Sequence, residues 1–161
     1  MSIDWPIILL AAIIPLIVGF IWYNPKVFGN AWMKSAGMTE ENMKGANMIL
    51  IFGLCYLFGI MLATALMTIV IHQMGLFSSL QGDETPETAA YMKNFFDTYG
   101  SRFRSFKHGA LHGTISGLFI ALPVLGTCAL FERKGFKYIA VHTGYWMLTL
   151  ALMGGVLCAF T

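Results

Sequence analysis

Long apolar stretches without Lys, Arg, Asp or Glu alternate along the chain with short polar segments. The four long stretches cover residues 5–24, 45–82, 109–131 and 138–161. A bilayer core of roughly 30 Å needs about 20 helical residues, at a rise of about 1.5 Å each. The pattern therefore predicts four membrane-spanning helices. We place these spans at about residues 3–23, 46–74, 106–130 and 138–160.

Three prolines affect these spans: one follows the end of the first span, and two should kink the spans that contain them. The first span should end at Asn24, because Pro25 disfavours helical geometry in the residue before it. Pro15 and Pro123 lie inside the first and third spans, where each removes a backbone hydrogen bond and should kink its helix. The polar segment 132–137 is short, so the last two spans should form an antiparallel hairpin.

A shorter helix is predicted directly after the first span. Phe28, Trp32 and Ser35 recur at helical spacing, with Lys34 at the edge of the apolar face. This pattern predicts a helix lying in the membrane interface over about residues 26–37. The aromatic anchors at this interface would be Trp22, Tyr23 and Trp32.

A second short helix is predicted before the third span, over about residues 86–99. Thr85 suits the cap of a helix, and Pro86 suits the first helical position. Apolar and aromatic side chains follow at spacings of three and four, namely Met92, Phe95, Phe96, Tyr99, Phe103 and Phe106. We expect this amphipathic face to pack on the bilayer surface, on the other helices or on a partner protein.

These elements predict an all-α fold. We expect an integral membrane four-helix bundle, with a short interfacial helix after the first span and an amphipathic helix before the third. It would form a single membrane domain over residues 1–161. Composition agrees, because only 11% of residues are charged, against about 25% in soluble domains. The net charge of +2 is too small to indicate nucleic-acid binding.

Basic residues are shared unevenly between the loops. The first and third loops carry Lys26, Lys34, Lys44, Arg133, Lys134 and Lys137. The second loop carries Lys93, Arg102, Arg104 and Lys107, together with acidic residues. The positive-inside rule therefore favours a multi-pass protein of the bacterial inner membrane with cytoplasmic first and third loops and both termini outside.

Glycines recur every four residues at the start of the third span. Gly109, Gly113 and Gly117 therefore line one helix face and allow another helix to approach closely. This small-xxx-small pattern is typical of packing between membrane helices. We expect the glycine face to serve helix packing and assembly.

A row of polar residues, His108, His112 and Ser116, lies one position behind the glycines. Two histidines at i and i+4 can share a metal ion, and His72 should reach the same side of the membrane. A haem or a divalent metal bound by His72, His108 and His112 is one interpretation. The other is that these histidines hydrogen-bond across helices or to lipid headgroups. We predict no cofactor and keep the haem or metal site as the alternative.

Glu132 and His142 fall on the opposite side of the membrane. Ionisable groups within a membrane are candidates for function, so a proton-linked role for this pair stays open. No predicted span carries Asp, Glu, Lys or Arg at its centre, which argues against a charge-coupled pump. The sequence has no phosphate-binding loop and no nucleophile elbow. We predict no catalytic residue and no enzymatic activity.

Several segments of the sequence resemble a known family. The segment 22–32, WYNPKVFGNAW, is similar to the Trp-Tyr…Phe-Gly…Trp signature that opens the bacterial membrane family called domain of unknown function 1761. The chain also resembles the version of this family that is seen in Bacteroidetes, in segments 106–113, 121–123, 131–132, 144–146 and 153–154. The resemblance covers nearly the whole chain and implies a four-helix inner-membrane protein. It implies no activity, because none is assigned to the family.

Three functions remain open from the sequence. The first, which we favour, is a non-catalytic accessory or assembly subunit that packs through its third span, as a homo-oligomer or within a larger membrane complex. The second is a small oligomeric transporter or channel that uses the kinks at Pro15 and Pro123. The third is a redox protein linked to haem, a metal or a quinone. Apart from the lipid bilayer, the sequence identifies no partner.

Overall fold

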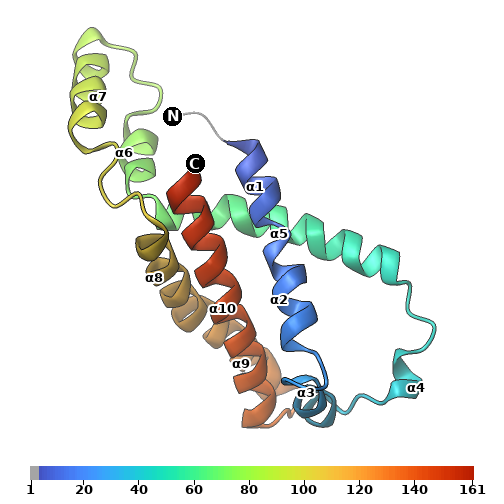
Figure 1. Cartoon of the computed structure of the whole chain (residues 1–161). Coiled ribbons are helices and arrows are strands. Elements are labelled where there is room, and N and C mark those ends of the chain that lie inside the picture. Colours follow the sequence, from blue (N-terminus) through green and yellow to red (C-terminus); the bar gives the residue numbers. More distant parts are fainter. Residues whose placement is uncertain (1–3) are drawn as a thin grey trace.

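The computed structural model describes residues 4–161, and these residues contain helices and no strand (Figure 1). The elements are α1 (Trp5–Ala11), α2 (Ile14–Trp22), α3 (Gly29–Ala36), α4 (Glu40–Met43), α5 (Met48–Val70), α6 (Gln73–Leu80), α7 (Pro86–Tyr99), α8 (Phe106–Ser116), the π-helix η1 (Gly117–Ala121), α9 (Leu122–Phe131) and α10 (Phe136–Phe160). In the described chain, four helical stretches are long and apolar enough to cross a membrane, namely Trp5–Trp22, Met48–Val70, Phe106–Phe131 and Phe136–Phe160. The predicted all-α fold is confirmed, and the chain is a multi-pass membrane protein.

The first span is interrupted where a kink was predicted. α1 ends at Ala11 and α2 begins at Ile14, because Pro15 has no N–H to donate to the carbonyl of Ala11. At the start of α1, the Asp4 carboxylate accepts a hydrogen bond from the amide of Ile7 (3.2 Å) and caps the helix. The predicted start of this span, at residue 3, lies outside the described residues.

The second span is shorter than the predicted residues 46–74. α5 ends at Val70, Ile71 is extended with φ −111°, and a separate helix begins at Gln73. His72 therefore sits at a break between two helices, directly after the span rather than inside it. This break lets the imidazole of His72 approach the third span.

The third span is a continuous helical path with one wider turn. α8 passes through η1 into α9, and the N–H of Leu122 bonds to the carbonyl of Gly117, five residues earlier. Pro123 follows directly and has no N–H to donate. The wider turn therefore accommodates the proline within the span. The hairpin to α10 is tight, and α10 begins at Phe136, two residues before the predicted start.

α10 lies at the centre of the bundle, side by side with α8 and in contact with α1, α2 and α5 (Figure 1). The buried core consists of Ile8, Ala11, Ala63, Leu66, Met67, Val70, Ile71, Leu150, Met153, Leu157 and Cys158. These residues come from α1 and from the C-terminal halves of α5 and α10. No residue from the N-terminal half of α5 belongs to this core, and that half of α5 diverges from α2 (Figure 1).

The glycine face of α8 packs on α10 of the same chain. A Cβ added at Gly109 or Gly113 would lie within 3.0 Å of the α10 backbone, at Gly154 and Leu150 respectively. Gly117 is also packed against α10. Only glycine permits so close an approach of two helix backbones. The fourth span therefore provides the close helix contact that the glycine repeat predicted.

Two short helices occupy the predicted places. α3 is shorter than the predicted 26–37, because residues 25–28 form turns, and it ends at Gly37 with φ +74°. α7 covers the predicted 86–99, and the hydroxyl of Thr85 accepts a hydrogen bond from the amide of Thr88 (3.2 Å) at its start. α7 contains no buried residue and stands apart from the spans (Figure 1).

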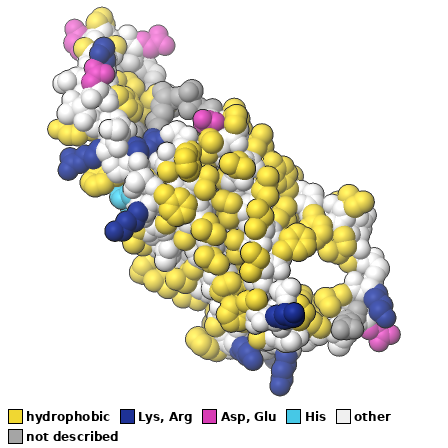
Figure 2. Space-filling model, viewed as in Figure 1, with side chains coloured by type: hydrophobic (Ala, Val, Ile, Leu, Met, Phe, Trp, Pro, Cys, Tyr) yellow, Lys and Arg dark blue, Asp and Glu magenta, His cyan; other side chains and the backbone are white. Residues whose placement is uncertain are grey.

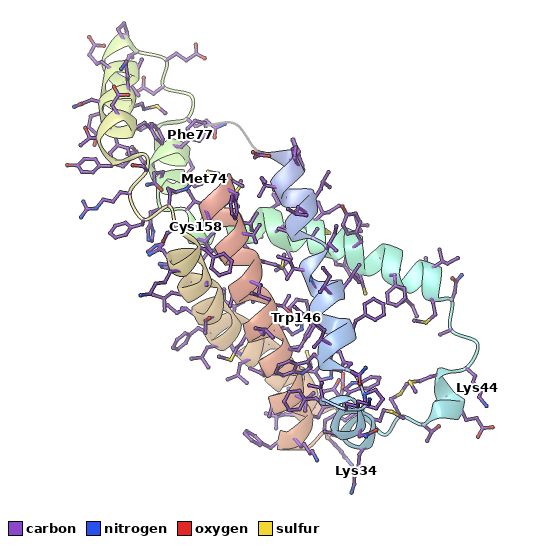
Figure 3. All side chains as sticks on the ribbon, in the orientation of Figure 1. Lys34, Lys44, Met74, Phe77, Trp146 and Cys158 are labelled. Atoms are coloured by element: carbon purple, nitrogen blue, oxygen red, sulfur yellow. The ribbon has the colours of Figure 1, made fainter. Side chains whose placement is uncertain are left out.

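Charged side chains gather at the two ends of the molecule, with an apolar band between them (Figure 2). Lys34 and Lys44 mark one end, and Phe77 lies at the other (Figure 3). At the first end, the Lys134 ammonium donates to the carbonyl of Ala36 (2.7 Å) and ties the loop after the third span to α3. The first and third loops therefore lie at the same end of the bundle.

Candidate functional site

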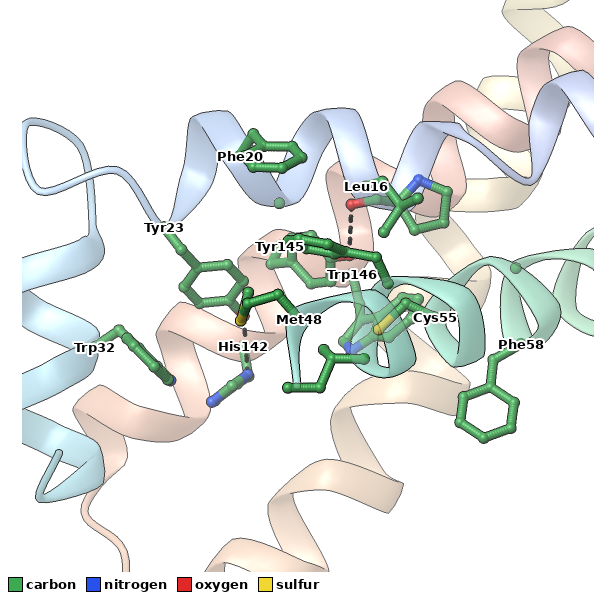
Figure 4. Close-up of a pocket in the computed structure, with 15 residues that line it drawn as sticks. Leu16, Phe20, Tyr23, Trp32, Met48, Cys55, Phe58, His142, Tyr145 and Trp146 are labelled. Carbon is green, nitrogen blue, oxygen red and sulfur yellow. Dashed lines mark hydrogen bonds between the residues drawn. The ribbon is translucent and has the colours of Figure 1, made fainter. Parts of the chain in front are cut away.

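A cavity of about 630 Å³ lies between α2, the N-terminal half of α5 and α10 (Figure 4). It forms because core packing is confined to the other half of α5, and the molecule is visibly hollowed there (Figure 2). Its apolar walls include Leu16, Phe20, Met48, Ile51, Phe52, Cys55 and Phe58. No Asp, Glu, Lys or Arg occurs among the lining residues that the structure describes. We call this space the interhelical cavity.

One end of the interhelical cavity is polar. The hydroxyl oxygen of Tyr23, one residue beyond the first span, lies 2.9 Å from Nδ1 of His142 on α10 (Figure 4). Burial raises the pKa of the Tyr23 phenol, which therefore stays protonated at neutral pH. Which atom donates depends on the imidazole tautomer: when the phenol donates to Nδ1, the imidazole proton lies on Nε2. Nε2 of His142 is buried and has no hydrogen-bond partner within residues 4–161.

Tyr145 forms the wall beside this polar end. Its hydroxyl donates to the carbonyl of Pro15 (2.9 Å), next to the break between α1 and α2. Its ring lies 5.2 Å from that of Tyr23 and 5.0 Å from that of Trp146. Tyr145 was not singled out in the sequence. The spacing of three and four between His142, Tyr145 and Trp146 could have placed all three on one face of α10.

The predicted interface anchors pack together at this end of the bundle. The indole N–H of Trp22 donates to the carbonyl of Val141 (3.0 Å), and its ring lies 4.4 Å from that of Phe28. Tyr23 meets Trp32 edge to face at 5.5 Å. The three anchors are half-buried, and their contacts hold α2, α3 and α10 together.

Three histidines meet at the opposite end of the bundle, and we call His72, His108 and His112 the histidine cluster. His108 and His112 lie one turn apart on α8, and His72 lies at the break before α6. One ring nitrogen from each residue lies within 4.8 Å of the others. The Nε2 atoms of His72 and His108 are 2.9 Å apart. The structure thus brings together the three histidines that the sequence placed on one membrane side.

The segment between α7 and α8 packs over the histidine cluster and is held from two sides. The Gln73 amide donates to the carbonyl of Arg102 (2.8 Å). The Cys158 sulfur lies 3.3 Å from the carbonyl oxygen of Phe103, whose ring stacks on His108 at 5.0 Å. Gln73 was not among the predicted site residues, nor was Phe103. Their contacts join parts of the chain that are far apart in sequence, and no local pattern indicates them.

Two other predicted site residues lie apart from both sites. The Ser116 hydroxyl donates to the carbonyl of His112 (2.9 Å), so it bonds to its own helix instead of joining the histidine cluster. Glu132 is exposed and follows the end of α9. Within residues 4–161, no hydrogen bond or salt bridge joins Glu132 to His142, whose Nδ1 is bonded to Tyr23.

Comparison with known protein families matches residues 6–158 to the family described as Protein of unknown function (DUF1761). The chain belongs to this family. The match covers nearly the whole chain, as the resemblance of the segment 22–32 implied. No curated protein and no solved structure matches the chain. This DUF1761 chain therefore offers two candidate sites, the interhelical cavity and the histidine cluster, at opposite ends of one bundle.

Proposed function

We propose that the protein binds, without chemical transformation, a lipophilic molecule whose polar end carries a carbonyl oxygen. The ligand would occupy the interhelical cavity, with its carbonyl at the Tyr23–His142 pair. The observation that carries this proposal is the buried Nε2 atom of His142, which has no hydrogen-bond partner within residues 4–161. We propose that the Tyr23 hydroxyl donates to Nδ1, so that Nε2 carries the proton and is the donor to the ligand.

The size and lining of the interhelical cavity support a small-molecule ligand. Ligand pockets commonly measure about 300–1,000 Å³ and combine apolar walls with a few fixed polar groups. This cavity measures about 630 Å³ and has its polar end beside Trp32, at the level of the interface helix. Its walls at Phe52 and Phe58 belong to the membrane-spanning part of α5. An amphiphile aligned with the bilayer would place its polar head at the polar end of the cavity and its apolar tail along the walls formed by α5.

The donor at His142 supports a carbonyl group in particular. A buried donor without a partner costs about 1–3 kcal/mol relative to one that is satisfied. A carbonyl oxygen accepts such a hydrogen bond and carries little desolvation cost into an apolar space. Both a fatty-acyl ester and a quinone offer this acceptor.

The uncharged lining supports binding over proton-coupled transport or acid–base catalysis. Those functions use ionisable groups along a path or at a reacting atom. Among the described lining residues, His142 is the one histidine, and no Asp, Glu, Lys or Arg accompanies it. Its position beside Tyr23 suits the holding of one polar group. The transporter alternative therefore gains no support from this cavity.

An accessory role within an assembly is a second proposal, and α7 favours it. α7 has no buried residue, and Tyr91 and Tyr99 are 58% and 43% exposed. Exposed apolar patches of this kind commonly mark contact surfaces. We propose that an assembly in the bacterial inner membrane would use α7, because the glycine face is already covered. Partners that co-purify with the wild type and are lost when Tyr91 and Tyr99 are both replaced by Ser would support this role.

Binding can be tested on the full chain in mild detergent with three probes of equal chain length: a fatty-acyl ester, the matching fatty ether and a long-chain quinone. Trp32 and Trp146 line the interhelical cavity, so quenching of tryptophan fluorescence or competition with a quencher reports occupancy. We expect the ester, the quinone or both to bind roughly two- to tenfold more tightly than the ether, which corresponds to about 0.5–1.5 kcal/mol for one hydrogen bond.

Tyr23→Phe removes the donor that fixes the proton of His142 and should abolish the preference over the ether. Tyr91→Phe, at an exposed position on α7, is the matched control and should retain that preference. Equal affinity of the wild type for the ester, the quinone and the ether would contradict the role of His142. Binding of the ester but not of the quinone, measured by competition with a quencher, would identify an acyl lipid as the ligand class, and the reverse result would identify a quinone.

A further inference from the structure

The histidine cluster lies at the opposite end of the bundle from the interhelical cavity and plays no part in lipophile binding. Its members come from α8 and from the break before α6, and one ring nitrogen of each lies within 4.8 Å of the others. We propose that His72, His108 and His112 bind one divalent transition-metal ion, of the class that includes Zn²⁺ and Co²⁺.

The distances fit a metal ion with a small adjustment of side chains. Zn–N bonds of about 2.0–2.1 Å in a tetrahedral site place two ligand nitrogens about 3.3 Å apart. The Nε2 atoms of His72 and His108 lie 2.9 Å apart, and the ring centres of His108 and His112 lie 4.6 Å apart. Imidazole nitrogen is a ligand that suits zinc, copper, nickel and iron. The three ring nitrogens lie within 4.8 Å of one another, so the widest pair must approach by at most about 1.5 Å to reach the tetrahedral separation.

One hydrogen bond and close ring contacts hold the three imidazoles of the histidine cluster together. His72 and His108 share a single hydrogen bond between their Nε2 atoms. The ring of His112 contacts both of these imidazoles: its centre lies 4.9 Å from that of His72 and 4.6 Å from that of His108. Three imidazoles in mutual contact repel one another when protonated, whereas neutral imidazoles can all direct a lone pair at one cation.

The surrounding contacts hold the ligands in place, as the surroundings of a metal site commonly do. Phe103 stacks on His108 with the rings 5.0 Å apart, and its φ of +65° is strained for a residue with a side chain. Gln73 fixes the preceding carbonyl of Arg102, and the following residue, Arg104, donates to the carbonyl of Cys158 (3.0 Å). The strained residue that orients His108 is therefore held on both sides.

Space for a fourth ligand lies beside His72. A cavity of about 280 Å³ is lined by His72, Gln73, Phe95, Tyr99, Arg102 and Phe103. The side-chain oxygen of Gln73 is buried and has no partner within residues 4–161. Three neutral imidazoles leave the full charge of the ion in place, so water, hydroxide or a small anion would complete the tetrahedron. This arrangement is an open site, not a closed structural one.

The geometry does not suit a haem. Two axial histidines of a haem approach the iron from opposite faces of a flat macrocycle. Here His108 and His112 extend from successive turns of one helix, and the Nε2 atoms of His72 and His108 are 2.9 Å apart. No macrocycle fits between nitrogens at that separation. A single ion is the ligand that this geometry favours.

The test uses the full chain, purified in detergent without a polyhistidine tag and stripped of metal with EDTA. Titration with Co²⁺ should give visible d–d absorption that saturates at one ion per chain and is displaced by Zn²⁺. His112→Ala should weaken Co²⁺ binding about tenfold or more, the scale of effects seen at metal sites. His142→Ala, a matched loss of one imidazole at the other end of the bundle, should leave binding unchanged.

X-ray absorption at the zinc edge of the wild-type protein provides a measurement that needs no variant. We expect the scattering pattern of three imidazoles at about 2.0 Å. Co²⁺ binding that is equal in wild type and His112→Ala would overturn the proposal, as would a zinc spectrum without imidazole scattering. Because His142→Ala alters the interhelical cavity and His112→Ala does not, failure of one proposal is distinguishable from failure of the other.

Discussion

The hydroxyl of Tyr23 lies 2.9 Å from Nδ1 of His142, and this contact joins the end of the first span to the first turns of the fourth. When the hydroxyl is the donor, the imidazole proton lies on Nε2, which is buried without a partner in the described chain. With that direction of donation, one hydrogen bond between two distant parts of the sequence gives an apolar space a single donor. The proposed lipophile site depends on that donor.

The packing of α8 on α10 predicts a large effect from a single methyl group. Gly113→Ala would place a Cβ within 3.0 Å of the Leu150 backbone and force the two helices apart. We expect a loss of about 1–3 kcal/mol in the free energy of unfolding, the usual cost of overpacking. Unfolding in mixed micelles by titration with a denaturing detergent would measure it. Gly53→Ala has nothing within 4 Å of its Cβ and should show no loss.

Gln73 predicts a local effect on the segment that packs over the histidine cluster. Gln73→Leu removes hydrogen bonds to the carbonyls of Tyr99 and Arg102, each worth about 0.5–1.5 kcal/mol. The amides of Arg104 and Ser105 should then exchange with deuterium faster than in the wild type. Gln81→Leu replaces an exposed glutamine after α6 and should leave their exchange rates unchanged. Equal protection in both variants would contradict this prediction.

The start of α7 should depend on pH. A hydrogen bond from the Thr88 hydroxyl, followed by one from the amide of Thr85, lowers the pKa of the Asp83 carboxyl below its ordinary value of 3.8. A lowered pKa in the folded state stabilises the first turn of α7 above the ordinary pKa, and this stabilisation is lost as the pH falls through the lowered value. NMR shifts of the Thr88 amide should follow that titration in the wild type. In Asp83→Asn they should not change over the same range.

The loop contacts predict the accessibility of each end of the protein. Lys134 bonds to Ala36, so the first and third loops share one side. We expect a cysteine placed at Lys34 or Lys134 to be shielded from a membrane-impermeant maleimide in intact bacterial cells without an outer membrane. A cysteine placed at Glu84 should react there. Reaction at Lys34 with protection at Glu84 would reverse the proposed orientation, and reaction at both would contradict the four-span topology.

Local patterns predicted those features that depend on residues near in sequence. The apolar stretches fixed the spans, and Thr85 and Pro86 fixed the start of α7, because caps and hydrophobic lengths act within a few residues. His108 and His112 share a face through the helical repeat alone. The sequence predicted only that His72 lies on the same side of the membrane as His108 and His112. Its contact with α8 depends on the break at Ile71.

Features that depend on how helices pack could not be predicted in the same way. The glycine repeat indicated a close helix contact, but it does not say whether the partner helix belongs to the same chain. The interhelical cavity results from the divergence of α5 from α2, and no residue pattern within α5 predicts this divergence. At its polar end, the sequence placed Tyr23 and His142 on the same side of the membrane, but their hydrogen bond depends on how α2 and α10 pack.

Occupancy of the interhelical cavity in the purified protein tests the central claim most directly. At Gly19 an added Cβ would lie 3.8 Å from the Tyr145 ring, so Gly19→Leu fits the helix and extends into the cavity. Gly53→Leu adds the same side chain where nothing lies within 4 Å. By native mass spectrometry, we expect one carbonyl-bearing lipophile per chain in the wild type and in Gly53→Leu, and none in Gly19→Leu. A wild type without a bound lipophile, or equal occupancy in Gly19→Leu, would contradict the account.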